Sequence, residues 1–424
     1  MASELGPGSR FRAQLKSTGQ DQKDPKVLEC EGIDLQRDGA PAIGHNGSFT
    51  QHWFKKEMHR LFLTRPALPA GNMTELRKAT DPFRPFFLYI ALQAMHVPSP
   101  GPVALEHFIR KYTSNGVTDQ FFVESNALIT VADTQLGDMR TVLEHAGRWD
   151  KTLLIHLSDN GGAVVYQDMG HAQGTNWPLR GMKRTYFEGG VRVPAFVTGG
   201  AVPPAMRGKQ LDGNVHIADW FATIAHLAGA RLTSSAGTVT SASIGDQAFN
   251  APPKSVSMLS YLSGDWPESP RKEIILGAGD TGETVHGVEA IIDGEFKLIN
   301  GTIPCSWDTW QGPVYPNASS PNPFPDLPRD YRDCVLKTTT YLFNIRTDAQ
   351  ERVNMASWEN MSTTLSTMFS KLGAARAQAA TESTVESEHD RALDNAMRTE
   401  TCQAYVDANR GFLGPYMKGI QEDE

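Results

Sequence analysis

The sequence predicts an α/β fold with a mostly parallel central sheet sandwiched by helices, and a small C-terminal antiparallel sheet with a helix. Three observations predict it. Two nearly continuous apolar runs are typical of strands that are buried on both faces. A long segment between them repeats its apolar residues at helical spacing. Short strand-like segments with an Asp-Gly turn follow nearer the C-terminus.

The first predicted strand is PFFLYIALQ, residues 85–93, and it ends in AMHVP. An amphipathic helix is expected over residues 120–145. The second buried strand, within residues 152–157, runs directly into the turn SDNGG. A short strand at PAFVTG, residues 194–199, precedes a helix within residues 216–230. Ligands of such sheets bind beyond the carboxyl ends of the strands, where AMHVP and SDNGG both fall.

The pattern changes at about residue 260. KEIILGAG, GVEAIIDGEFKLING and TTYLFNI predict the hairpins of a small antiparallel sheet. A helix is expected over roughly residues 357–378. We therefore place two domains at residues 1–262 and 263–424.

Composition limits the possible functions. A net charge of -8 over 424 residues argues against a general nucleic-acid binder. No run of about 18 apolar residues predicts a membrane span, and residues 1–10 lack the apolar stretch of a signal peptide. Five N-x-S/T acceptors nevertheless favour the secretory pathway, at Asn46, Asn72, Asn300, Asn317 and Asn360.

The four cysteines leave two interpretations open. Cys305 and Cys334 bracket a loop rich in Pro, Asn and Asp, which is a plausible disulfide in an oxidising compartment. Cys30 and Cys402 lie near opposite ends of the chain. Free buried cysteines are as plausible there as a bridge between them.

Oxygen-bearing side chains and a histidine follow the two buried strands. Asp159 and Asn160 supply a carboxylate and an amide oxygen before two glycines, which suits a hard cation such as Ca²⁺. The alternative is an ordinary Asx turn. His96, which follows the other strand, is a candidate donor to an anion. A lone histidine at a strand end is more often structural.

A basic segment, NWPLRGMKRTYFEGGVRVP, follows the second strand. Lys183 lies there with Arg180, Arg184 and Arg192, and its three glycines allow close approach of the backbone to a ligand. Taken alone, such a loop is usually solvated surface. Beside a cation site and a histidine, it predicts a pocket for a small divalent oxyanion ester, either a phosphate or a sulfate.

Five segments occur in the same order as matching blocks of the sulfatase family, which they resemble: LYIALQAMHVP, HLSDNGG, NWPLRGMKRTYFEGGVRVP, HIADWFATIAHLAG and YLFNIRTDAQERVNMA. They are similar in particular to the arylsulfatase B-like branch, the N-acetylgalactosamine 4-sulfatases. The resemblance covers roughly residues 37–356 and implies an alkaline-phosphatase-like fold. It also implies that Asp159 and Asn160 ligate calcium, while His96 and Lys183 bind sulfate or leaving-group oxygens.

The chain departs from the family pattern in one respect. Sulfatases carry an Asp-Asp metal motif, a C-x-P-x-R segment whose cysteine becomes the formylglycine nucleophile, and a further Lys and His before these blocks. None of these is in the printed sequence. The resemblance implies that Cys30 and Cys402 pair with cysteines of that portion. We therefore expect residues 1–262 to be an N-terminally incomplete catalytic domain, and this chain alone to be inactive.

Three functional hypotheses follow. The first is a secreted or lysosomal calcium-dependent sulfatase that hydrolyses sulfate esters, including those of sulfated glycans. The second is a non-catalytic sulfatase-like protein that binds anions or glycans. The third is a metal-dependent phosphoesterase of the same superfamily, with a Thr or Ser nucleophile and zinc. An amide ligand such as Asn160 favours calcium over zinc.

Overall fold

The computed structural model describes residues 11–15, 28–32, 36–37, 40–41, 58, 85–92, 102–116, 120–166, 170–171, 174–235, 238–245, 247–278, 288–303, 310 and 337–379. The chain divides into two compact units, one of Met1–Trp53 with Ala380–Glu424 and the other of Phe54–Ala379. In the first unit, β1 (Phe11–Leu15) pairs with β2 (Leu28–Gly32), and β3 (Gln36–Arg37) pairs with β4 (Ala40–Pro41). The predicted division between residues 262 and 263 stays a prediction.

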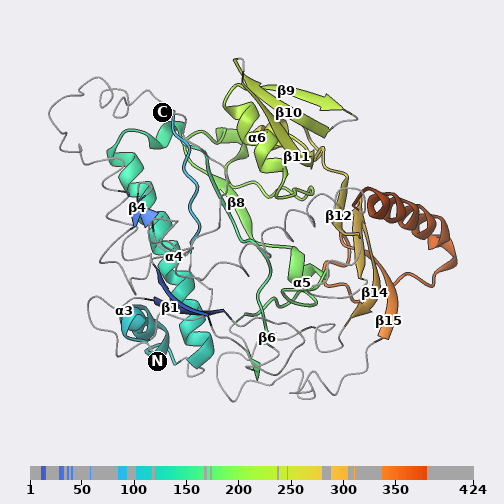
Figure 1. Cartoon of the computed structure of the whole chain (residues 1–424), viewed down its shortest axis with the longest axis horizontal. Coiled ribbons are helices and arrows are strands. Elements are labelled where there is room, and N and C mark those ends of the chain that lie inside the picture. The colour runs from blue at the N-terminus through green and yellow to red at the C-terminus, as the bar shows by residue number, and fades with distance from the viewer. Residues whose placement is uncertain are drawn as a thin grey trace. The chain divides into compact units, whose positions relative to one another are not determined.

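The long predicted helix is confirmed. α4 spans Gln120–His145 and packs beside α3 (Pro102–Thr113) in the second unit (Figure 1). Its buried apolar side chains recur along one stripe, as the helical spacing predicts; they are Val123, Ala127, Leu128, Val131, Val142 and Leu143. Within the described part of the chain, no helix combines the length and the apolarity that crossing a membrane requires.

Two of the predicted strands form, but they run antiparallel to each other, whereas the sequence predicts a mostly parallel sheet. The alternation of helices and strands confirms the α/β class. β5 (Leu154–Leu157) and β8 (Ala195–Thr198) are antiparallel, with Leu157 opposite Ala195. A parallel pair needs a crossover that returns the chain to the other end of the sheet. The described parts of residues 158–194 contain only the one-turn helix α5 (Glu188–Val191) and the β6–β7 hairpin (Val165–Tyr166, Gly170–His171).

The prediction of a buried strand at residues 85–93 is wrong for the residues described. Residues 85–92 have no regular secondary structure, and Phe87 and Tyr89 are 71% and 81% exposed. An apolar run becomes a buried strand only where neighbouring strands satisfy its backbone and cover its faces. No strand pairing in the described ranges includes this segment.

The C-terminal antiparallel sheet is confirmed. Its strand order is β12 (Glu273–Gly277), β13 (Glu289–Asp293), β14 (Phe296–Ile303) and β15 (Lys337–Asn344) (Figure 1). The predicted Asp-Gly turn joins β13 to β14, and its Gly294 has a φ of 62°. A helix over residues 362–379 confirms the last predicted helix.

Both faces of this sheet are buried. Alternate residues along its strands point to opposite faces, and each set packs in its own cluster. One face packs Ile291, Leu298 and Leu342 against Met368 and Leu372 of the 362–379 helix. The other face packs its buried residues around Phe187 of the basic segment; they are Ile274, Val288, Ala290, Ile292, Ile299, Ile303, Phe343 and Ile345. The C-terminal sheet therefore supports the segment in which the sequence places the anion site.

Lys297 lies on this second face and is fully buried. Its ammonium is 2.7 Å from Glu188 Oε1 and 2.7 Å from Glu351 Oε1. Burial acts to lower the pKa of Lys297, but the two carboxylates outweigh it and raise the pKa above its ordinary value. Burial raises the pKa of Glu351 to about 7, although Lys297 acts in the opposite direction.

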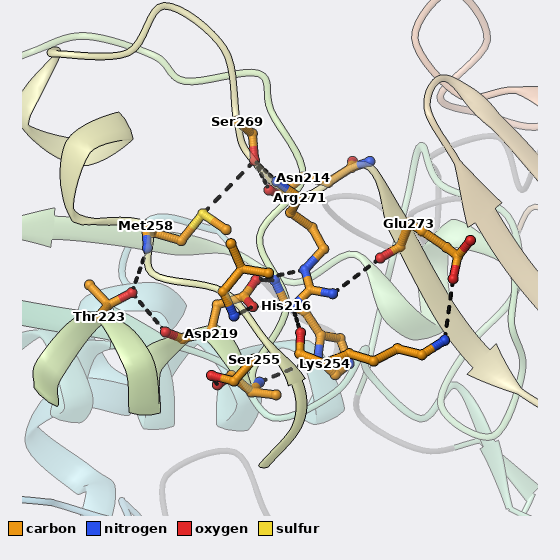
Figure 2. Close-up of polar contacts among 12 residues, drawn as sticks. Asn214, His216, Asp219, Thr223, Lys254, Ser255, Met258, Ser269, Arg271 and Glu273 are labelled. Carbon is orange, nitrogen blue, oxygen red and sulfur yellow. Dashed lines mark hydrogen bonds and ion pairs between the residues drawn. The ribbon is translucent and has the colours of Figure 1, made fainter. Parts of the chain in front are cut away.

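A second buried charge pair anchors the helix α6 (Asp219–Leu227) to the segment before β12 (Figure 2). Asp219 is fully buried, and Arg271 Nε donates to its Oδ2 at 3.0 Å. The backbone N–H groups of His216 and Val256 donate to the same carboxylate at 2.8 and 2.9 Å. These contacts also hold the end of β11 (Gln247–Ser255), the outer strand of the sheet β11-β10-β9 that includes β10 (Thr238–Ile244) and β9 (Arg231–Ser235).

We expect Arg271→Met to lower the free energy of unfolding by about 3–5 kcal/mol, because it leaves the Asp219 carboxylate buried without its cation. Urea unfolding followed by tryptophan fluorescence measures this change. Lys272→Met is the matched control, since Lys272 pairs with Glu268 on the surface and we expect no resolvable change. Equal effects of the two substitutions would contradict the assignment.

We expect the free energy of unfolding to fall as pH rises from about 4.5 to about 7, because unfolded Glu351 loses its proton before the folded group does. The contribution is present below the ordinary pKa of 4.5, is lost as pH rises through 7, and is on the order of 3 kcal/mol. Urea unfolding across this range should show that Glu351→Gln lacks this slope, whereas the exposed Glu359→Gln keeps it. A profile of Glu351→Gln that parallels the unsubstituted chain would refute the prediction.

Candidate functional site

Glycines bring the SDNGG turn against the basic segment. The N–H of Gly161 donates to the carbonyl of Gly190 at 2.9 Å. A Cβ on Gly161 would lie 1.8 Å from the carbonyl oxygen of Gly189, and a Cβ on Gly190 would lie 2.2 Å from that of Thr185. The close approach of the turn to the basic segment therefore requires glycine at position 161, and the fold of the basic segment itself requires glycine at position 190.

Asn176 binds the turn from the other end of the basic segment. Its Oδ1 accepts from the N–H of Gly162 at 2.7 Å, and its Nδ2 donates to the carbonyl of Gly162 at 2.8 Å. Nδ2 also contacts the carbonyl of Gly181 at 3.2 Å. The N–H of Lys183 donates to the same Gly162 carbonyl at 3.1 Å. The backbone of Lys183 is thus fixed next to the SDNGG turn.

Asp159 and Asn160 lie at the start of this turn, directly after β5. Asp159 is exposed, and its Oδ1 accepts from the N–H of Asn160 at 2.9 Å. Asn160 is half-buried, and its Nδ2 donates to the carbonyl of Gly161 at 2.8 Å. Ser158 Oγ donates to the carbonyl of Asn160 at 3.0 Å. These bonds hold the two side chains in one tight turn.

The donor chemistry of the turn fits calcium in part. A carboxylate and an amide oxygen on adjacent residues are ligands that Ca²⁺ accepts, but Ca²⁺ takes six to eight oxygens. Among the residues that the structure describes, no group of three His, Cys, Asp or Glu side chains comes together around a possible metal position. The described turn therefore offers two candidate ligands, and calcium binding by Asp159 and Asn160 stays a prediction.

The basic side chains of the segment differ in their surroundings. Arg180 is buried, with its guanidinium 4.4 to 4.9 Å from the ring centroids of Phe187, Trp310 and Tyr341. Its Nη1 donates to the carbonyl of Glu351 at 2.9 Å. These contacts give Arg180 a structural role.

Arg192 and Lys183 differ from Arg180 and from each other in their contacts. Arg192 is 3.3 Å from Glu188 Oε2 and is thereby engaged with a carboxylate. Lys183 is half-buried, and no carboxylate of the described residues forms an ion pair with its ammonium. Arg184 is exposed, so Lys183 is the half-buried cation of this segment that has no ion-pair partner among the described residues.

The structure brings together three of the four predicted site residues: Asp159, Asn160 and Lys183. His96 lies outside the described residues, as do the side chains of all four cysteines. Sequence analysis missed Asn176, which binds the peptide groups of Gly162, and Glu188, which pairs with Lys297. No periodic pattern marks either residue. The one local signal is that Asn176 directly precedes the Trp-Pro pair at the start of the basic block.

Part of the chain is similar to known proteins. Residues 72–230 match the family model described as Sulfatase. Mouse arylsulfatase J is 30% identical over 199 residues, which are 46% of this chain and 28% of that protein. Human arylsulfatase A is 31% identical over 150 residues, which are 35% of this chain and 26% of that protein. The matches thus span less than a third of these relatives.

Two solved structures are also similar to this chain, at low sequence identity. A structure from work on the metabolism of multiple glycosaminoglycans by Bacteroides thetaiotaomicron has a TM-score of 0.48 and 20% identity, covering 81% of this chain and 56% of its own. PsFucS1 sulfatase from Pseudoalteromonas has a TM-score of 0.42 and 17% identity, covering 67% and 53%. The SDNGG turn, Asn176 and Lys183 all lie within residues 72–230, the part of the chain that is similar to the Sulfatase family model.

Proposed function

We propose that the whole protein hydrolyses sulfate esters in a calcium-dependent reaction, at a site built on the SDNGG turn. The observation that carries this proposal is the position of Lys183. Its backbone is bonded to Gly162, the residue as a whole is half-buried, and its ammonium has no ion-pair partner among the described residues. A partly desolvated cation is stabilised by an anion, and the sulfatase domain makes a sulfate ester the favoured one.

The residues of the turn would divide the work. Asp159 and Asn160 would hold calcium, and the bound cation would offset negative charge on the sulfate oxygens. Lys183 would bind a sulfate oxygen and stabilise charge that develops on the leaving oxygen. His96 would donate to the same group. The short bonds within residues 158–162 would keep the ligands in place during binding.

A sulfated glycan is the substrate class that we propose. The N-acetylgalactosamine-6-sulfatase of dog, whose name specifies a sulfated amino sugar, is 29% identical over 147 residues, which are 34% of this chain and 25% of that protein. Placement in the arylsulfatase B-like branch stays a prediction. We further propose that the protein enters the secretory pathway and acts in a lysosome or outside the cell, with its sequons as the support.

A second function is proposed for the chain as printed. No C-x-P-x-R segment occurs in its 424 residues. We therefore expect this chain alone to bind sulfate and calcium without hydrolysing an aryl sulfate. The phosphoesterase hypothesis is weaker, because Asn160 is a better ligand for calcium than for zinc.

Thermal unfolding of the purified chain with inorganic sulfate and calcium chloride tests the site. At about 100 times the dissociation constant, each ligand should stabilise the fold by about 2.7 kcal/mol and raise the Tm accordingly. Lys183→Ala should abolish the response to sulfate, and Asp159→Asn should abolish most of the response to calcium. The exposed Lys209→Ala is the control and should respond as the unsubstituted chain does.

One result would count against the proposed anion site, and another against the expectation that this chain alone is inactive. A response to sulfate that survives Lys183→Ala would place the anion elsewhere. Hydrolysis of p-nitrocatechol sulfate by the 424-residue chain, lost in Lys183→Ala, would support the sulfatase site but refute the expectation that this chain alone is inactive.

The two described sequons should differ in glycosylation. Asn360 lies in the 3-10 helix Glu359–Met361 and is exposed. Asn300 is paired within β14, and its Oδ1 accepts from Thr340 Oγ1 at 2.8 Å. On secretion from mammalian cells, we expect a glycan at Asn360 and none at Asn300, because transfer needs an accessible acceptor. Mass spectrometry of peptides before and after glycosidase treatment measures occupancy, with Asn360→Gln as the control. An unmodified Asn360 in secreted protein would disprove this.

A further inference from the structure

We propose that Lys297, Glu188 and Glu351 form a positioning cluster that holds the SDNGG turn and Lys183 in register with each other. The three residues come from β14, from the first position of α5 and from the segment after β15. None of them touches the turn itself. The proposal rests on the proposed function only in taking that turn as the ligand site.

The cluster binds the first residue of α5 by an ion pair and by a backbone hydrogen bond. The Lys297 ammonium contacts one carboxylate oxygen of Glu188, and Glu351 Oε2 accepts from the N–H of Glu188 at 2.7 Å. Glu188 is therefore fixed through both its side chain and its backbone. Arg180 in turn donates to the carbonyl of Glu351. Arg180 and Glu188 of the basic segment are thus both bonded to the cluster.

Backbone hydrogen bonds connect α5 to the SDNGG turn and to Lys183. The N–H of Gly189 donates to the carbonyl of Arg180 at 2.6 Å, which closes the loop between residues 180 and 189. The carbonyl of Gly190 accepts from Gly161, next to Asn160. The carbonyl of Gly162 accepts from Lys183. A continuous series of hydrogen bonds and ion pairs therefore joins Lys297 to both parts of the ligand site.

The three residues of the cluster are buried although they are charged. Lys297 and Glu351 are fully buried, and Glu188 is 3% exposed. Apolar side chains of similar volume would bury here at lower cost, so such a group is best explained by the geometry that it specifies. Glu351 has a φ of 54°, an unfavourable conformation that its bonds to Arg180, Glu188 and Lys297 hold in place. With Arg192, these are the charged residues that face the cluster.

The Asp219–Arg271 pair offers a matched control. It is similarly buried and lies in the same unit of the chain, but its side chains bond residues 216, 254, 256 and 273 and not residues 159–192. Loss of either pair should lower global stability. Only loss of the Lys297 cluster should release the turn from the basic segment.

Amide hydrogen exchange of the full chain tests this difference. The experiment follows the N–H groups of Gly161, Lys183 and Gly189 against those of Leu128 and Leu143 in α4. In the charge-balanced variant Lys297→Met with Glu351→Gln, we expect the first three amides to exchange roughly tenfold faster relative to α4. In Arg271→Met, the ratio should stay unchanged. Lys297→Arg, which keeps a cation between the two carboxylates, should restore most of the protection.

A faster exchange that is uniform over all five amides in the Lys297 variant would overturn the proposal, because it would show a merely structural role. So would a change of the ratio in Arg271→Met that equals it. The Tm response to inorganic sulfate is a second readout, expected to be lost with the Lys297 cluster and kept in Arg271→Met. If the unsubstituted chain shows no response to sulfate, the proposed function fails, while the exchange ratio still decides the positioning role.

Discussion

The hydrogen bond from the Gly161 amide to the Gly190 carbonyl joins the two stretches of chain whose side chains carry the proposed chemistry. This bond can form because Gly161 has no Cβ: a methyl group there would lie 1.8 Å from the carbonyl oxygen of Gly189. The position of Asp159 and Asn160 relative to Lys183 follows from this backbone contact. Each other contact of the site reinforces it, as Asn176 does by binding both polar groups of Gly162.

Local pattern was sufficient for much of the fold. The α4 helix, β5, β8 and the β13–β14 hairpin form where apolar periodicity and the Asp-Gly turn predict them. These features depend on residues that are close in sequence. The exposed segment 85–92 shows the limit of the method, because its apolar run gives the composition of a buried strand but not the neighbours that would bury it. The direction of β8 relative to β5 likewise depends on the connection between them.

The candidate site was predicted unevenly for a related reason. Asp159, Asn160 and Lys183 lie in recognisable blocks, and the structure brings those blocks together. The residues that hold the blocks are separated by long stretches of chain: Glu188 binds Lys297 and Glu351 across 109 and 163 positions. No local pattern contains such pairings. Lys297 is also atypical, because it is a buried charge at a position of β14 where an inward-facing apolar residue is expected.

The two faces of the C-terminal sheet pack against different parts of the chain. Substitutions at neighbouring positions of one strand should therefore have different consequences. Positions such as Ile291 and Leu298 contact the 362–379 helix, so a change of volume there can be compensated within the same part of the chain. Their neighbours Ala290, Ile292 and Ile299 face Phe187, and a change there is transmitted to the basic segment. Successive residues of β13 and β14 should therefore co-vary with different partners. This part of the chain is also not a separable module, because a fragment without it would leave Phe187 and Glu188 facing solvent.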